Sequence, residues 1–372
     1  MIYLDHAATS MHKPPQVYEQ VLTAMKTCAS LGRSGHEAAL KAAETAFMCR
    51  SVAGDFFEAM PEQVVFTSNA THGLNIAIHS LIGHGDRVVV SGFEHNAVMR
   101  PLYHIGANII VAGTKLFDQA DTFSAFEKAI TPETKAVICT HVSNVFGYIL
   151  PVEKIAALCH DRNVPFVLDA AQSAGVLPVS LRKLRAAFIA MPGHKSLLGP
   201  QGTGLLLCGQ MPKPLLSGGT GSNSLNANMP DFLPDIAEVG THNIPGIAGL
   251  AAGIVWLRRN GIGHVRRREQ VLLSRLINSL CDMSDIRYFC GEKDVQTGVL
   301  SLQIFGTDCE TAAQKLAENG IAVRAGLHCA PLAHRSAGTI GEGTVRVSFS
   351  GENTAGDVDA LSDALTQIIR EK

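Results

Sequence analysis

Short apolar runs alternate with stretches of helical periodicity through the first two-thirds of the chain. The runs are rich in Val, Ile, Leu and Phe with few interruptions, which is typical of strands buried on both faces of a sheet. They occupy residues 64–67, 87–91, 109–112, 136–140, 166–169, 188–191 and 205–208. Helical spacing lies between several of them, as at 73–82, 123–130 and 152–159. This alternation predicts an α/β fold with a mostly parallel seven-stranded sheet and helices on both faces.

The last third of the chain has a different order of elements. Long helices are expected at 247–259 and 264–283, then strands near 286–289 and 299–304, a helix at 310–319, and strands near 322–324 and 344–349. A final helix begins near Thr354, with Asp357 three residues later as its capping partner. We therefore expect an N-terminal arm at 1–13, a large α/β domain at 14–255 and a small α+β domain at 256–372.

Composition places the chain among folded globular proteins. Its 372 residues suffice for two or three domains at about 150 residues each. The sequence is 46% hydrophobic and 17% charged, whereas a disordered chain would be less apolar and more charged. Lys and Arg number 31 against 33 Asp and Glu. The chain thus lacks the basic excess of a nucleic-acid-binding protein, and we expect no nucleic-acid partner.

Cysteine usage and the apolar segments indicate a cytoplasmic protein with reduced thiols. The apolar region around 244–257 is too short, and too interrupted by Gly and Pro, to span a bilayer, and no signal peptide is visible. The nine cysteines form no C-x-x-C motif, so no metal site is expected. We expect eight of them to be small core residues.

Two polar residues follow neighbouring predicted strands. Asp169 ends the strand at 166–169, and Lys195 lies beside His194 in a Gly-rich turn after the strand at 188–191. Ligands of open α/β sheets bind at this edge. Pyridoxal phosphate is held by a Lys Schiff base and by an Asp that pairs with its pyridinium nitrogen. An Asp in this place can also simply cap a helix, but together with Lys195 it predicts a pyridoxal phosphate site.

Two further segments suit the same cofactor. Residues 66–75 run from a strand into a predicted helix and include Ala70 and Thr71. The free N–H groups of a helix N-terminus bind phosphate, although Ser, Thr and Asn before a helix are also ordinary caps. His95 follows the strand at 87–91, where its ring could lie on the pyridine ring.

Six sequence blocks together resemble a cysteine desulfurase, in the class V aminotransferase group of fold-type I pyridoxal phosphate enzymes. The blocks are YLDHAATS at 3–10, EHN at 94–96, HVSN at 141–144, LDAAQ at 168–172, GHK at 193–195 and RAGLHCA at 324–330. The resemblance covers nearly the whole chain. It is greatest to the Suf-type branch, group II, which also contains selenocysteine lyases.

The resemblance implies a homodimer and a role for each matching residue. Lys195 would bind the cofactor and move the substrate's α-proton, and His95 would stack on the ring. The cofactor-binding residues would be Lys195, Asp169, Gln172, His95, Ala70, Thr71, His194, Asn144 and, from the partner subunit's copy, Thr241. The substrate-binding residues would be Arg346, Asn144, Arg33, Ala8 and Arg324. The planar fork of an Arg suits a carboxylate.

Cys329 is the cysteine that we expect to be catalytic. It follows Gly326 and His328 and precedes Pro331, which indicates a loop, and Arg324 and His328 could favour its thiolate form. In the family such a Cys takes the sulfur of bound L-cysteine, which leaves L-alanine and an enzyme persulfide. The short connection from Cys329 to the strand at 344–349 resembles group II. It implies weak basal activity that a sulfur-acceptor protein stimulates.

Three alternatives remain at the level of sequence. A selenocysteine lyase would use the same motifs on L-selenocysteine. A plain class V aminotransferase would need Lys195 and Asp169 but would be indifferent to replacement of Cys329. A non-enzymatic scaffold with the same fold would bind no cofactor, and the intact set of cofactor residues argues against it.

Overall fold

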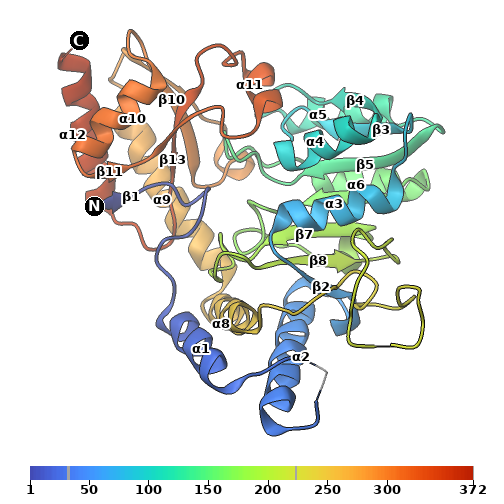
Figure 1. Cartoon of the computed structure of the whole chain (residues 1–372). Coiled ribbons are helices and arrows are strands. Elements are labelled where there is room, and N and C mark those ends of the chain that lie inside the picture. The colour runs from blue at the N-terminus through green and yellow to red at the C-terminus, as the bar shows by residue number, and fades with distance from the viewer. Residues whose placement is uncertain (32–33, 223, 372) are drawn as a thin grey trace.

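A seven-stranded sheet, called here the large sheet, forms the centre of the N-terminal two-thirds (Figure 1). The computed structural model describes residues 1–31, 34–222 and 224–371, and orders the strands β2-β8-β7-β6-β5-β3-β4. β8 is antiparallel to β2 and β7, whereas the remaining neighbours are parallel, so the predicted sheet is confirmed. The strands are β2 (Val64–Thr67), β3 (Arg87–Ser91), β4 (Asn108–Ala112), β5 (Thr134–Thr140), β6 (Phe166–Asp169), β7 (Phe188–Pro192) and β8 (Gly204–Cys208).

Helices cover both faces of the large sheet because successive strand residues point to opposite sides. Val88 and Val90 of β3 belong to an apolar cluster with α3 and α4. Val89 belongs to another cluster with α2, α5, α6 and α8. This double burial explains why the strands are nearly continuous in apolar residues. The helices are α2 (Glu37–Phe57), α3 (Ala70–Leu81), α4 (Asn96–Ile105), α5 (Gln119–Ala129), α6 (Val152–Asp161) and α8 (Ile244–Asn260).

A four-stranded antiparallel sheet, the small sheet, carries most of the C-terminal third, in the order β12-β13-β10-β9. α9, α10 and α12 share its apolar core through residues such as Leu273, Leu316 and Leu365. Reciprocal capping by Thr354 and Asp357 begins α12, as predicted. The elements are α9 (Ile262–Leu280), β9 (Ile286–Phe289), η2 (Lys293–Val295), β10 (Val299–Ile304), α10 (Cys309–Glu318), β12 (Arg324–Gly326), α11 (Pro331–Ala337), β13 (Thr344–Ser348) and α12 (Ala355–Arg370).

The N-terminal arm packs with the small sheet. β1 (Ile2–Tyr3) pairs in parallel with β11 (Ile321–Ala322), and Leu4 is buried in the small sheet's core. The chain then reaches α1 (Pro15–Thr27), which lies against α8. The predicted boundary between residues 255 and 256 falls inside α8, and the division into domains stays a prediction.

Several element ends differ from the predictions. α3 begins at Ala70 rather than at 73, because the Asn69 side chain accepts a hydrogen bond from the His72 N–H. The strand predicted at 322–324 is divided at Val323 into β11 and β12, which pair with different strands. Helices α1, α2, α4 and α11, and the shorter η1 (Pro61–Gln63), α7 (Leu181–Leu184) and η2, have no counterpart among the predicted elements.

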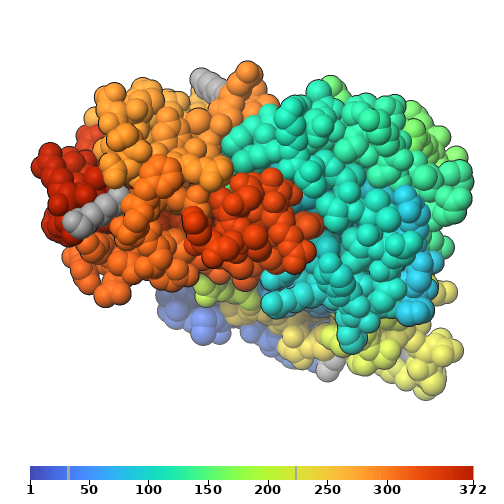
Figure 2. Space-filling view, turned by 90° about the horizontal axis from the view of Figure 1, so that it is seen from above, coloured from blue at the N-terminus to red at the C-terminus, as the bar shows by residue number. Residues whose placement is uncertain are grey.

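The segment between β12 and β13 connects the two sheets. The Asn96 N–H of α4 donates to the Cys329 carbonyl at 2.8 Å, and the Ser336 hydroxyl donates to the Gly92 carbonyl at 2.7 Å. In Figure 2 the orange-red surface of this segment meets the teal surface of the large-sheet helices. The loop that carries Cys329 is therefore fixed to the large sheet, although β12 belongs to the small one.

All nine cysteines are free. Five are buried as predicted, at positions 49, 139, 159, 208 and 309, whereas Cys28 is half-buried and Cys281 and Cys290 are exposed. The expectation of eight core cysteines is wrong for these three, because they lie at the surface ends of α1, α9 and β9. Within the described part of the chain, no helix has the length and apolar character that crossing a membrane requires.

Candidate active site

Asp169 ends β6 at the carboxyl edge of the large sheet, the edge where ligands of such sheets bind. Its side chain is buried, and Oδ1 accepts a hydrogen bond from the Ala171 N–H at 2.9 Å. Burial raises the pKa of this carboxyl, while the Ala171 N–H and the charge of Lys195 act to lower it. An acid so placed suits a ligand that presents a proton or a positive charge.

Lys195 lies in the turn after β7 and faces the same edge. The Gly193 N–H donates to the Thr203 carbonyl at 2.8 Å, and a Cβ at Gly193 would collide with the Thr203 hydroxyl. Burial lowers the pKa of Lys195 to about 8, although Asp169 acts to raise it. A share of this amine is therefore neutral near pH 7, which is the nucleophilic form of a Lys.

His95 is the N-cap of α4, and its Nδ1 accepts a hydrogen bond from the Ala97 N–H at 3.0 Å. Burial first, and the charge of Lys195 second, lower the pKa of His95 to about 4. The ring is therefore neutral near pH 7, with Nδ1 fixed as the acceptor and the proton on Nε2. His95 thus has one defined ring orientation beside Lys195.

The N-terminus of α3 is the candidate anion site. The Asn69 side chain already takes the His72 N–H at 2.9 Å, so an anion would meet the N–H groups of Ala70 and Thr71, the first two of the helix. β8 approaches this turn closely, because a Cβ on Gly204 would lie 2.9 Å from the Asn69 backbone. Glycine at position 204 therefore lets β8 pack closely against the start of α3.

Cys329 is exposed in the loop after β12. Asn144 Nδ2 donates to the His328 carbonyl at 2.8 Å, and the Asn96 N–H holds the Cys329 carbonyl. These contacts keep His328 and Cys329 in the left-handed region, with φ of 50° and 57°, which non-glycine residues seldom adopt. The Arg324 guanidinium lies 3.8 Å from the Cys329 sulfur.

His328 does not have the predicted role beside the Cys329 thiol. Its Nε2 faces the carbonyl and the hydroxyl of Thr344, at 3.1 and 3.2 Å. Burial lowers its pKa far below the ordinary value, so the ring is neutral. His328 therefore brings no positive charge to the thiol, and the cation that contacts the Cys329 sulfur is Arg324.

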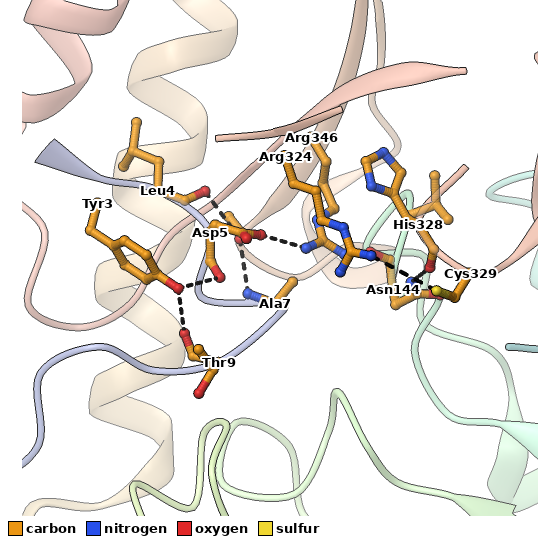
Figure 3. A network of polar contacts seen from close by, with 12 residues as sticks. Tyr3, Leu4, Asp5, Ala7, Thr9, Asn144, Arg324, His328, Cys329 and Arg346 are labelled. Carbon is orange, nitrogen blue, oxygen red and sulfur yellow. Dashed lines mark hydrogen bonds and ion pairs between the residues drawn. The ribbon is translucent and has the colours of Figure 1, made fainter. Parts of the chain in front are cut away.

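Arg346 joins the N-terminal arm to Asn144, the residue that binds the Cys329 loop (Figure 3). Its side chain is 1% exposed, with Nη2 at 2.6 Å from the Asp5 carboxylate and Nη1 at 2.9 Å from the Asn144 carbonyl. Arg324 lies opposite Arg346 in the β12–β13 ladder. Two guanidinium groups thus gather near Lys195, whose pKa both of them act to lower.

Three other predicted residues lie around this centre. Gln172 donates to the Ala7 carbonyl at 2.9 Å, so the arm is tied to the loop after β6. His194 is paired through Nδ1 with the Thr9 hydroxyl at 3.1 Å, and burial lowers its pKa to about 4. Ala8 is half-buried in the arm, within a turn closed by its N–H and the Asp5 carbonyl.

Two predicted residues stand apart from this group. Thr241 is exposed and lines, with Ser68, a cavity of about 240 Å³ near the start of α3. Its expected contact with a partner subunit stays a prediction. Arg33 lies outside the described residues.

Two acids near this centre, the half-buried Asp5 and the buried Glu94, were not predicted from the sequence. Asp5 lies in the first matching block but has no local feature that points to Arg346. Glu94 is fully buried, and its Oε1 accepts hydrogen bonds from the Ser91 hydroxyl at 2.5 Å and the Thr140 N–H at 2.7 Å. Burial raises the pKa of Glu94 to about 8. Its position directly before His95, three residues after the end of β3, was the available signal.

A cavity of about 400 Å³ reaches Lys195 and Gln172 from the side of α8 and α9. Trp256 and Arg268 are among its lining residues. Within the ranges that the structure describes, no group of three or more His, Cys, Asp or Glu side chains is arranged to hold a metal ion.

Comparisons with known proteins agree with this geometry. The sequence model of the class V aminotransferases matches residues 2–361. A probable cysteine desulfurase of Methanothermobacter thermautotrophicus is 31% identical, with 99% of this chain and 94% of the relative covered.

Solved structures agree as well. The apo cysteine desulfurase of Thermococcus onnurineus superposes with a TM-score of 0.90 at 31% identity, with 100% of this chain and 95% of that one covered. The Escherichia coli cysteine desulfurase CsdA gives 0.86 at 26% identity, over 99% and 94% of the two chains. The fold is that of the fold-type I pyridoxal phosphate enzymes, and the chain belongs to the cysteine desulfurases of the class V aminotransferase family.

Proposed function

We propose that the protein is a pyridoxal phosphate-dependent cysteine desulfurase, which converts L-cysteine to L-alanine and takes the sulfur onto Cys329 as a persulfide. The observation that carries this proposal is the placement of Cys329. Its exposed thiol belongs to the small sheet, yet its loop is bound to Asn96 and Asn144 of the large sheet, beside His95. An aminotransferase needs no thiol in this place.

The residues at the sheet edge fit pyridoxal phosphate. Lys195, with its lowered pKa, would bind the aldehyde carbon, and the buried Asp169 would hold the proton of the ring nitrogen. The N–H groups of Ala70 and Thr71 would take the phosphate. Asn144 Oδ1 is buried and has no partner among the described residues, so it has an acceptor free for the ligand. When bound, the cofactor withdraws electrons from the substrate's α-carbon.

The two guanidinium groups suit the carboxylate of the amino acid. Arg346 keeps Nε buried and without a partner among the described residues, and Arg324 is half-buried beside it. A guanidinium binds a carboxylate through two parallel N–H donors. We assign substrate binding to Arg346, Asn144, Arg324 and the arm at Ala8, and leave Arg33 as a prediction from sequence.

Sulfur transfer exchanges one bond to sulfur for another. The Cys329 thiolate attacks the sulfur of L-cysteine, so a sulfur–sulfur bond forms and the carbon–sulfur bond breaks. The electron pair of the broken bond stays on carbon, which takes a proton to give L-alanine. Lys195, neutral in part near pH 7, serves as the base for the α-proton. Arg324 stabilises the attacking thiolate from 3.8 Å.

The exposed surface and the family resemblance both support protein partners for this chain. We propose a homodimer, because α1 and α2 expose large apolar side chains that a second copy would cover: Tyr18, Leu22, Met25, Phe47 and Met48 are each more than half exposed. A sulfur-acceptor protein would take the persulfide sulfur from the exposed Cys329 loop. The nine free cysteines suit the reducing cytoplasm.

The test measures alanine and sulfide released from L-cysteine in the presence of a reductant. The wild type should release both in equal amounts, and Cys329→Ala should release neither while it keeps the cofactor's absorption. Cys281→Ala, which removes another exposed thiol, should behave as the wild type. Desulfuration of L-cysteine that persists in Cys329→Ala would overturn the proposal.

The same variants separate the rival functions. A selenocysteine lyase would turn over L-selenocysteine much faster than L-cysteine. An aminotransferase would instead convert a keto acid to an amino acid, equally well with and without Cys329. Addition of an acceptor protein or a stronger reductant should raise the rate on L-cysteine if the persulfide is released slowly, as the resemblance to group II implies.

A further inference from the structure

Asp5 is the carboxylate in contact with the buried guanidinium of Arg346. The distance is 2.6 Å, and the Asp5 side chain is 19% exposed whereas that of Arg346 is 1% exposed. Figure 3 shows the Asp5 carboxylate reaching Arg346 from the arm, while Asn144 and Cys329 lie on the other side of the two Arg side chains. Asp5 thus lies on one side of the two guanidinium groups, and the Cys329 loop lies on the other.

The arm that presents Asp5 is held by a series of hydrogen bonds. The Ser348 N–H donates to the Leu4 carbonyl at 2.8 Å, and the Ala7 N–H donates to the Ser348 hydroxyl at 2.9 Å. The Tyr3 hydroxyl donates to the Asp5 carbonyl at 3.1 Å. Hydrogen bonds on both sides of Asp5 therefore fix its backbone against β13 and keep its carboxylate beside Arg346.

The charges of this group do not balance within the chain. Arg346 and Arg324 are neighbours in the β12–β13 ladder and carry two positive charges. Asp5 supplies one negative charge, which leaves one guanidinium charge for a ligand. The proposed substrate-binding residues Arg346, Arg324 and Asn144 form what we call the amino-acid site. Without Asp5, both guanidinium charges would be available to an anion in this site and would hold it more tightly, because Coulomb attraction is strong in a partly buried site.

We infer that Asp5 is a specificity-determining residue of the amino-acid site, which matches the Arg346–Arg324 pair to a single carboxylate and limits how tightly that carboxylate is held. The inference rests on the proposed function, since it takes an α-amino acid as the ligand. The product L-alanine carries the same carboxylate as L-cysteine. Asp5 therefore promotes release of the product after sulfur transfer.

The test compares L-alanine with ethylamine, which has the amine and the methyl carbon but no carboxylate. Each is titrated into the cofactor-loaded enzyme, and the change in cofactor absorption reports binding. Asp5→Asn keeps the shape and an acceptor for Arg346 but removes the charge. It should bind L-alanine roughly tenfold or more tightly than the wild type, with ethylamine affinity unchanged.

Asp359→Asn is the matched control, because Asp359 forms an exposed pair with Arg275 at 2.7 Å in the small sheet's helices. It should leave both affinities unchanged. Should Asp5→Asn fail to fold, Asp5→Ala removes the same charge, and the same rise in L-alanine affinity is expected. Affinity for L-alanine that stays equal or falls, or that changes in parallel with ethylamine, would overturn the inference. Enzyme whose absorption responds to neither amine would instead contradict the proposed function.

Discussion

Replacing Glu238 with Gln removes one charge from a buried ion pair that ties three segments together. Glu238 Oε2 lies 2.6 Å from Arg50 Nη2, and the two side chains are 4% and 10% exposed. Oε1 accepts from Arg50 Nη1 at 2.8 Å and from the Phe66 N–H at 2.6 Å. One carboxylate thus joins α2, β2 and the segment before α8 that carries Thr241.

The magnitude follows from burial. Exposed ion pairs contribute about 0–1 kcal/mol, whereas removal of one partner from a buried pair costs about 3–5 kcal/mol, because the other charge is left uncompensated. Gln keeps the volume of Glu and can still accept the Phe66 N–H. The Arg50 guanidinium also retains its contact with the Phe66 ring, at 4.1 Å from the ring centre. We therefore expect Glu238→Gln to lose about 3 kcal/mol of unfolding free energy, the lower end of that range.

Urea unfolding measures this loss as a lower midpoint with an unchanged slope. The matched control is Glu37→Gln, since Glu37 pairs with Lys41 at 2.7 Å but is 82% exposed, and we expect a change below about 0.5 kcal/mol. The double variant Arg50→Met with Glu238→Gln should lose less than Glu238→Gln alone, because no unpaired charge remains. A loss in Glu238→Gln as small as in the control would refute the reasoning.

Two further outcomes are expected. A Cβ on Gly204 would lie 2.8 Å from Thr67 Oγ1 and 2.9 Å from the Asn69 backbone, so Gly204→Ala should weaken equilibrium binding of pyridoxal phosphate more than that of unphosphorylated pyridoxal. Gly341→Ala, where a Cβ meets nothing within 4 Å, should change neither. The pKa of Lys195 is lowered to about 8, and only the neutral amine is nucleophilic. The rate at which apoprotein incorporates the cofactor, followed by absorbance, should therefore rise with pH and level off above this pKa; a flat profile would contradict this assignment.

The architecture of the large sheet was predictable because its signal is local. Strands buried on both faces must be apolar at nearly every position, and β3 and β6 satisfy this rule with few exceptions. The end of such a strand also locates the ligand edge, which is why Asp169 and Lys195 could be assigned from sequence. The reversed direction of β8 leaves no such trace, since a buried antiparallel strand has the same apolar pattern.

The contacts that complete the site join residues far apart in the chain, so they could not be predicted from local sequence patterns. Asp5 and Arg346 are 341 residues apart, and no periodicity connects them. The left-handed backbone of His328 and Cys329 is held by Asn144 and Asn96 from other segments, so the local residue types do not indicate it. His328 looked like a charge beside the thiol, but burial against Thr344 makes it neutral.

The pairing of β1 with β11 also has a consequence for biosynthesis. The chain is synthesised from its N-terminal side, so Ile2 and Tyr3 leave the ribosome long before their strand partners Ile321 and Ala322. Arg346, the partner of Asp5, is synthesised later still. During most of translation the arm therefore has no place to bind, and Leu4 lacks the core that buries it. Because closing so long a loop costs conformational entropy, the arm should dock among the last events of folding. A nascent chain would then already hold the large sheet, with Asp169 and Lys195 in place, before Asp5 pairs with Arg346.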